Sequence, residues 1–164
     1  MASLLNWFTA MVALFGVILI VVQVRQAAQA QLRDHDRRRR QATLEFYAET
    51  MERRIEWREV LPNDRDAEAV AAFVPVPSDT ADPANKLLGD YLNYYELIAI
   101  GVNLGILDFE TIYRVAGTRL IAAFDNYRGW IEGRREYFGS PALFCELEVL
   151  TDQLRENRRA NTAA

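Results

Sequence analysis

The sequence contains very little of the side-chain chemistry that catalysis, metal binding or cross-linking requires. Among its 164 residues there is one cysteine, Cys145, and one histidine, His35. A single cysteine excludes an intrachain disulfide and fits a reducing compartment. A single histidine between Asp34 and Asp36 does not supply the converging ligands of a metal site, and no histidine near Cys145 would activate its thiol. We therefore expect no metal, no cofactor and no enzymatic activity.

Charge is absent from the first 24 residues. Residues 4–24 read LLNWFTAMVALFGVILIVVQV, and a helix of this length covers about 30 Å, the hydrocarbon thickness of a bilayer. We interpret residues 1–24 as a transmembrane anchor in contact with membrane lipid, carried by Leu4, Trp7, Leu14, Val17 and Val24. The alternatives are a cleaved signal peptide and a buried helix. The first lacks a cationic leader, and nothing downstream is apolar enough to surround the second.

Arginines begin where the apolar segment ends, and they predict its orientation. Positive residues beside a span stay on the cytoplasmic side. The N-terminus should therefore lie outside and the rest of the chain in the cytoplasm. Because four consecutive arginines surround a helix rather than form one face, we expect them mainly to set topology, with contact to lipid or to an acidic partner as the alternative. The six arginines that follow the segment are Arg25, Arg33, Arg37, Arg38, Arg39 and Arg40.

The distal sequence is acidic. Residues 61–164 carry ten basic and sixteen acidic side chains, so we expect no nucleic-acid surface there. Lys86 is the only lysine beside eighteen arginines, a bias typical of a GC-rich bacterial genome. Together with the anchor, this bias predicts a bacterial inner-membrane protein.

Glycine and proline are absent from residues 18–60, and acid-before-base pairs four residues apart support a helix there. We predict one continuous helix from about Ser3 to Val60, in which residues 25–60 form a charged stalk that Pro62 ends. An apolar stripe runs along it at helical spacing, and it packs either on the chain's own distal domain or on a partner. The candidate partner interface consists of Leu44, Ala48, Met51 and Ile55.

The remainder is also predicted to be helical. Residues 61–83 form a connector with four prolines, in which Asp66 to Phe73 can form one short helix. Residues 84–155 form a small helical domain, followed by a polar tail at 156–164 that we expect to be disordered. The overall prediction is an all-α protein: a single N-terminal transmembrane helix, a long helical stalk and a small cytoplasmic helical domain.

Three apolar periodicities divide the helical domain. Gly105 is expected to end the first helix, and Asp108 to cap the second. Gly117 marks a break or bend within the second helix. Ser140 is expected to cap the third helix, with Pro141 at its first position.

Glu96 is the most unusual carboxylate, because it lies inside the most apolar distal helix. A lone acid in that position points to solvent or pairs with an arginine, and the candidates are Arg119, Arg134 and Arg135. No second acid, metal cluster or phosphate loop accompanies it, so we do not expect catalysis.

The stretch LNYYELIAIGVNLGILD, residues 92–108, resembles the signature of a bacterial family known as domain of unknown function 4760. This resemblance implies an N-terminal membrane helix, a charged helical stalk and a small helical domain. It implies no activity or cofactor. It also implies that four residues are structural hallmarks: Asn93, Glu96, Gly105 and Asp108.

These observations favour a non-enzymatic role. We expect an assembly or accessory subunit of a membrane complex, or a self-associating scaffold, with a protein partner. The alternative is a membrane-tethered sensor or effector whose cytoplasmic helical domain binds a protein partner.

Overall fold

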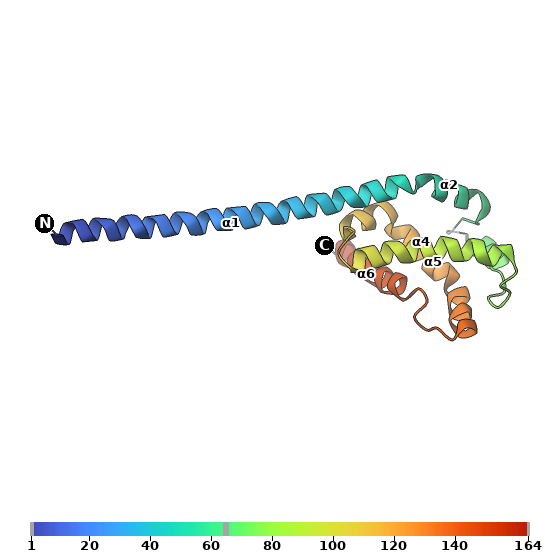
Figure 1. Ribbon diagram of the computed structural model, residues 1–164. Coiled ribbons are helices and arrows are strands. Elements are labelled where there is room, and N and C mark those ends of the chain that lie inside the picture. Colours follow the sequence, from blue (N-terminus) through green and yellow to red (C-terminus); the bar gives the residue numbers. More distant parts are fainter. Residues whose placement is uncertain (1, 64–65, 164) are drawn as a thin grey trace. The chain divides into compact units, whose positions relative to one another are not determined.

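The computed structural model describes the backbone of residues 2–63 and 66–163, and the side chains of residues 15–16, 19–63 and 66–162. The described residues form six helices and no strand, so the chain is all-α, as predicted (Figure 1). The helices are α1 (Ala2–Glu49), α2 (Met51–Val60), α3 (Ala67–Phe73), α4 (Pro83–Asn103), α5 (Phe109–Phe138) and α6 (Cys145–Ala163).

The chain divides into two compact units, Met1–Arg38 and Arg39–Ala164. In the first unit the described apolar side chains, Phe15 and those from Leu19 to Val24, are exposed. Within the residues that the structure describes, none of the helices has both the length and the apolar character needed to cross a bilayer. Of the expected anchor residues Val24 is exposed. The side chains of Leu4, Trp7, Leu14 and Val17 lie outside the described residues.

The helix predicted to be continuous to Val60 is interrupted at Thr50, between α1 and α2. The Thr50 hydroxyl donates to the carbonyl of Phe46 at 2.9 Å and lies 2.9 Å from the hydroxyl of Tyr94. A threonine that bonds back to the preceding turn bends a helix. The bond to Tyr94 of α4 is a tertiary contact, which the local sequence does not reveal.

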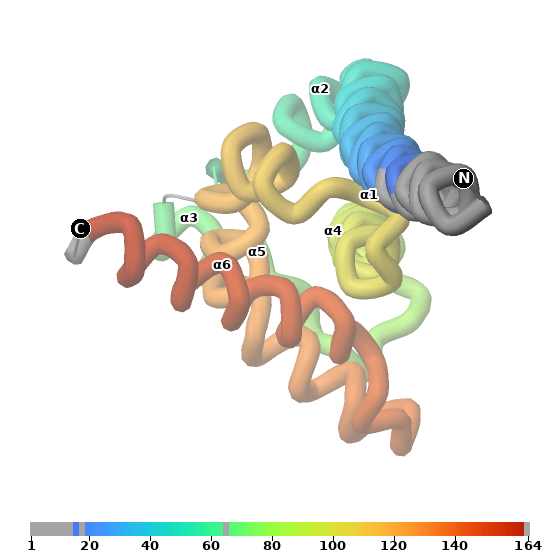
Figure 2. The backbone as a smooth tube through the Cα atoms, turned by 90° about the vertical axis from the view of Figure 1, so that its left-hand side faces the viewer, coloured from blue at the N-terminus to red at the C-terminus, as the bar shows by residue number. Residues whose placement is uncertain are grey.

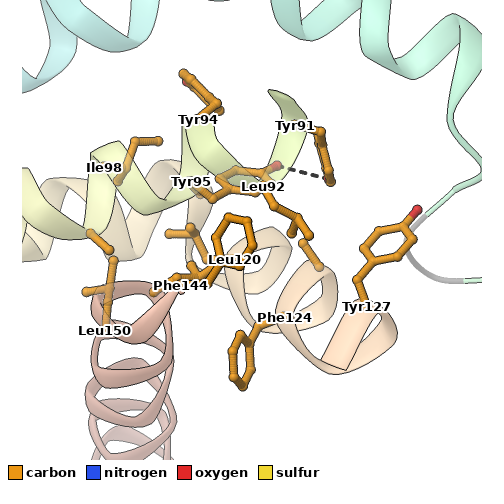
Figure 3. Close-up of a cluster of buried hydrophobic side chains, with 14 of the residues drawn as sticks. Tyr91, Leu92, Tyr94, Tyr95, Ile98, Leu120, Phe124, Tyr127, Phe144 and Leu150 are labelled. Carbon is orange, nitrogen blue, oxygen red and sulfur yellow. Dashed lines mark hydrogen bonds between the residues drawn. The ribbon is translucent and has the colours of Figure 1, made fainter. Parts of the chain in front are cut away.

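The core of the second unit lies where α4, α5 and α6 cross, and α6 contacts both other helices (Figure 2). Figure 3 shows the side chains of these helices gathered in one cluster, with the hydrogen bond between Tyr91 and Tyr95 drawn as a dashed line. The core also includes Trp57 and Leu61, at α2 and its end, and Val70 of α3. Side chains with no exposed surface include Leu88, Leu92, Ile98, Ile112, Leu120, Tyr127, Ile131, Leu147, Leu150 and Leu154.

Asn85 ties the connector to the helices. It is 1% exposed, and its side-chain amide donates to the carbonyls of Val76 at 2.8 Å and Asp79 at 2.6 Å. Its Oδ1 accepts a hydrogen bond of 2.6 Å from the indole of Trp130 on α5. A buried amide satisfied in this way fixes the path of a loop that has no regular structure of its own.

Helix boundaries agree with several predictions and contradict others. The cap of α5 at Asp108, the short helix α3 and the positive φ of Gly105 after α4 match the sequence. The expected break at Gly117 is wrong, because α5 runs unbroken from Phe109 to Phe138. A Cβ at Gly117 would lie 3.6 Å from Leu154 of α6, an ordinary van der Waals distance, so this position has room for a small side chain. The tail expected to be disordered is helical as far as Ala163.

Two other glycines of α5 give a matched test of how the connector packs on that helix. Gly129→Ala should stabilise the protein by about 0.5–1 kcal/mol, because nothing lies within 4 Å of the added Cβ and alanine favours a helix. Gly133→Ala should destabilise it by about 1–3 kcal/mol, because the Cβ would lie 2.7 Å from the rigid ring of Pro77. Thermal unfolding measures both changes in stability, and equal effects would contradict the docking of the connector on α5.

Candidate functional site

Glu96 of α4 caps a different helix, α6. One carboxylate oxygen accepts the backbone N–H of Leu147 at 2.7 Å, and the other accepts that of Glu146 at 3.2 Å. These groups belong to the first turn of α6, whose N–H groups have no partner within the helix. Phe144, the residue before α6, has a φ of 58° and a side chain without a hydrogen-bond acceptor, so the cap comes from across the fold.

Two predictions about this region are therefore wrong. Ser140 does not cap the third helix of the domain, because residues 141–144 form turns and α6 begins at Cys145. Glu96 binds backbone N–H groups rather than the side chain of an arginine. Of its candidate partners, Arg135 pairs with Glu148 at 2.9 Å, and Arg134 donates to the carbonyl of Pro77 at 2.8 Å.

Burial raises the pKa of Glu96 above its usual value, against the opposing effect of the two backbone hydrogen bonds. The nearby Glu146 carboxylate also raises the pKa, and Arg135 lowers it. Asn103 holds Glu146 in place: its amide donates to the Glu146 carboxylate at 2.7 Å and to its carbonyl at 3.3 Å. The end of α4 therefore holds the start of α6 at two points.

Asp108 caps the start of α5. One carboxylate oxygen accepts the backbone N–H of Thr111 at 2.9 Å and its hydroxyl at 2.6 Å. The backbone N–H of Asp108 donates to the buried hydroxyl of Thr43 at 2.8 Å. Burial works to raise the pKa of Asp108, but the bonds from Thr111 and the guanidinium groups of Arg39 and Arg40 together hold it below its usual range.

The arginine run therefore has distinct partners along its length. Arg38 pairs with Asp34 at 2.7 Å on the surface of α1. Arg39 and Arg40 approach Asp108 at 3.3 Å and 3.9 Å. The acidic surface that the sequence assigned to a neighbour thus includes a residue of the same chain. Arg25, Arg33 and Arg37 are exposed.

The two remaining hallmark residues differ in their structural roles. Gly105 follows α4 with a φ of 70°, a conformation that favours glycine, and its N–H donates to the carbonyl of Val102 at 2.9 Å. Asn93 is exposed, and nothing in the structure explains why it would be a hallmark.

The apolar stripe is open to solvent. Leu44, Met51 and Ile55 are 52%, 57% and 41% exposed, and Ala48 is exposed as well. A neighbouring face of the same helices provides the internal contacts, and it includes Thr43, Thr50, Arg54 and Trp57. The chain's own distal domain therefore covers these four side chains only in part and leaves an exposed apolar surface.

The stripe forms one wall of a groove of about 690 Å³, and the start of α5 forms the other. The α5 side contributes Val115 and the small residues Ala116 and Gly117. We call this feature the stripe groove. Four arginines also line it: Arg54, Arg58, Arg114 and Arg119.

Arg54 is the residue of this region that sequence reasoning missed. It is 9% exposed, and its guanidinium lies over the ring of Tyr47, with Cζ 3.4 Å from the centroid. It donates to the carbonyl of Thr50 at 3.3 Å and to that of Tyr47. The only sequence signal was an arginine three residues before a tryptophan in the expected stalk, which does not distinguish a buried arginine from a solvated one.

In the described part of the chain, no group of three His, Cys, Asp or Glu side chains converges as metal ligands do. Cys145 is a half-buried free thiol at the first position of α6, and His35 is exposed.

Glu96 and Asp108 should affect the pH dependence of folding stability in opposite directions. A raised pKa means that the folded protein holds its proton more tightly than the unfolded chain, so ionisation of Glu96 favours unfolding. The stability of the wild type relative to Glu96→Gln should therefore fall as the pH rises. The pKa of Asp108 is lowered, so the stability relative to Asp108→Asn should rise with pH.

Urea unfolding of the full-length protein from about pH 3 to pH 7 covers the ordinary pKa values of both carboxyl types. Slopes of the same sign for the two variants would contradict the assignment. A Glu156→Gln variant, changed at an exposed position of α6, serves as the control for loss of one carboxylate.

The comparisons with known proteins identify a family but no activity. A family model described as domain of unknown function (DUF4760) matches residues 10–154, which include all six helices in whole or in part. No curated protein and no solved structure matches the chain. The chain belongs to the family of domain of unknown function 4760.

Proposed function

We propose that this protein is a non-enzymatic, single-pass membrane protein that acts as an accessory subunit or scaffold and docks a protein partner in the stripe groove. The observation that carries this proposal is the exposure of Leu44, Met51 and Ile55 along one wall of a groove of about 690 Å³. Large apolar side chains gathered on an open surface are typical of protein interaction sites.

The chemistry of the groove supports a helical partner with an apolar face and acidic flanks. Ala48, Ala116 and Gly117 are small, so a partner helix can approach the backbone closely. Met51 is flexible and adapts to the shape of an apolar surface. Arg58 and Arg119 supply positive charge at a surface in an otherwise acidic region, and complementary charge sets the register of docking.

Membrane attachment is the second element of the proposal. It rests on the uncharged run at residues 4–24 and on the six arginines from Arg25 to Arg40 that follow it. We propose that this run anchors the protein in a bacterial inner membrane, with the N-terminus outside and the helical unit in the cytoplasm.

The docking proposal predicts that Met51→Glu and Ile55→Glu release a stoichiometric partner from the protein in mild detergent, because each places a carboxylate on the apolar wall. A photoreactive crosslinker at position 48 in native membranes should join the protein to that partner. Val60→Glu is the matched control, since Val60 is 61% exposed on α2 and lies outside the groove. Crosslinks only to the protein's own chain, or release by all three variants alike, would refute docking in the groove.

The topology proposal predicts that a reporter active only in the cytoplasm works when fused after Ala164. Leu14→Arg should impair insertion, because one charge at the centre of a span costs about 2.5–3.5 kcal/mol. Fractionation and carbonate extraction measure the attachment. Activity only from an exported reporter, or unchanged membrane retention of Leu14→Arg, would contradict the proposed anchor or its orientation.

A further inference from the structure

A second hollow, of about 280 Å³, lies beside the stripe groove. Its lining includes Trp57 and Arg58 of α2 and Tyr91 and Tyr95 of α4. We call it the arginine cavity, because Arg54, Arg58 and Arg119 line both this hollow and the groove. Its volume is at the lower end of the range for small-molecule sites.

The described lining of the arginine cavity carries positive charge. None of the described residues that line it carries a carboxylate. Elsewhere in the same unit, arginines with limited exposure pair with acids: Arg39 with Asp108, Arg135 with Glu148, and Arg155 with Asp125. Neither Arg58 nor Arg119 forms an ion pair within the described part of the chain. Among the described residues, the lining of this cavity thus holds three arginines and no acid, which favours the binding of an anion.

The cavity combines this charge with a fixed aromatic wall. Trp57 is 6% exposed, and its ring meets that of Tyr91 edge-on at a centroid distance of 5.7 Å. The hydroxyl of Tyr91 donates to that of Tyr95 at 3.3 Å. Arg54 is held by the carbonyls of Thr50 and Tyr47, whereas Arg58 and Arg119 are exposed. The site therefore has a buried aromatic side and two exposed arginines beside it.

We propose that the arginine cavity binds a small organic phosphate, with its phosphoryl group against Arg58 and Arg119 and its organic part against Trp57 and Tyr91. Guanidinium groups bind phosphate oxygens through paired, charge-assisted hydrogen bonds. A phosphate monoester carries nearly two negative charges at neutral pH, which suits three arginines better than a single carboxylate does. Arg58 and Arg119 also line the stripe groove, but binding of a phosphate in the cavity does not require the proposed docking role.

Phenyl phosphate is the probe, titrated by calorimetry into full-length protein in detergent and phosphate-free buffer. We expect saturable binding that Arg58→Gln and Arg119→Gln each weaken by about tenfold or more, through loss of charge-assisted bonds. Arg158→Gln, an exposed arginine of α6 outside the cavity, should bind as the wild type does. Both cavity arginines are exposed, so all three variants should retain the unfolding temperature of the wild type.

Two further titrations distinguish a phosphate ligand from a carboxylate ligand. Binding of phenyl phosphate should strengthen between about pH 5 and pH 7.5, because the second ionisation of a phosphate monoester lies near pH 6. Benzoate, which keeps one charge over that range, should bind at least about tenfold more weakly and without this trend. Absence of saturable binding, equal loss in Arg158→Gln, or benzoate binding as tightly as phenyl phosphate would overturn the proposal.

Discussion

The closure of the helical unit depends on the Glu96 carboxylate at the first turn of α6. This helix covers the core with Leu147, Leu150 and Leu154, which have no exposed surface. The chain enters it through Phe144, which has a positive φ and cannot cap it. Glu96 supplies the missing acceptor from α4, and the same bond that starts α6 also sets its place on the core. The cost of this arrangement is a half-buried carboxylate, whose raised pKa reflects its lost hydration.

Asp108 is also a helix-capping carboxylate, but its pKa is shifted in the opposite direction. It also caps a helix, but it does so from the residue before that helix and with two arginines nearby. These surroundings lower the pKa of Asp108, whereas burial raises the pKa of Glu96. Thr43 adds a contact between α1 and the start of α5, so part of the predicted stalk belongs to the compact helical unit.

The open surfaces of this unit gather around Arg54, Arg58 and Arg119. These three arginines line both the stripe groove and the arginine cavity. The two hollows therefore share their positive charge but differ in their other lining residues. The groove is shallow and apolar enough for a protein segment, and the cavity is small and aromatic.

The helices were readable from the sequence because their signals are local. Apolar spacing, the cap at Asp108 and the glycine after α4 act within a few residues, so the all-α class and the positions of α3, α4 and α5 follow directly. The stripe of Leu44, Ala48, Met51 and Ile55 was also visible as a periodicity, but its exposure was not. Whether a helix face is covered depends on which other helix lies beside it.

Tertiary structure decided what those local signals leave open. The cap of α6 comes from a residue about fifty positions earlier, the bend at Thr50 involves Tyr94, and Gly117 lies against Leu154. The three cavity arginines lie on α2 and α5 and meet only in the folded unit. The sequence by itself determined the helices and their apolar faces, because these depend on neighbours along the chain. Only the fold decided which charges are capped, paired or left facing a hollow, because that depends on neighbours in space.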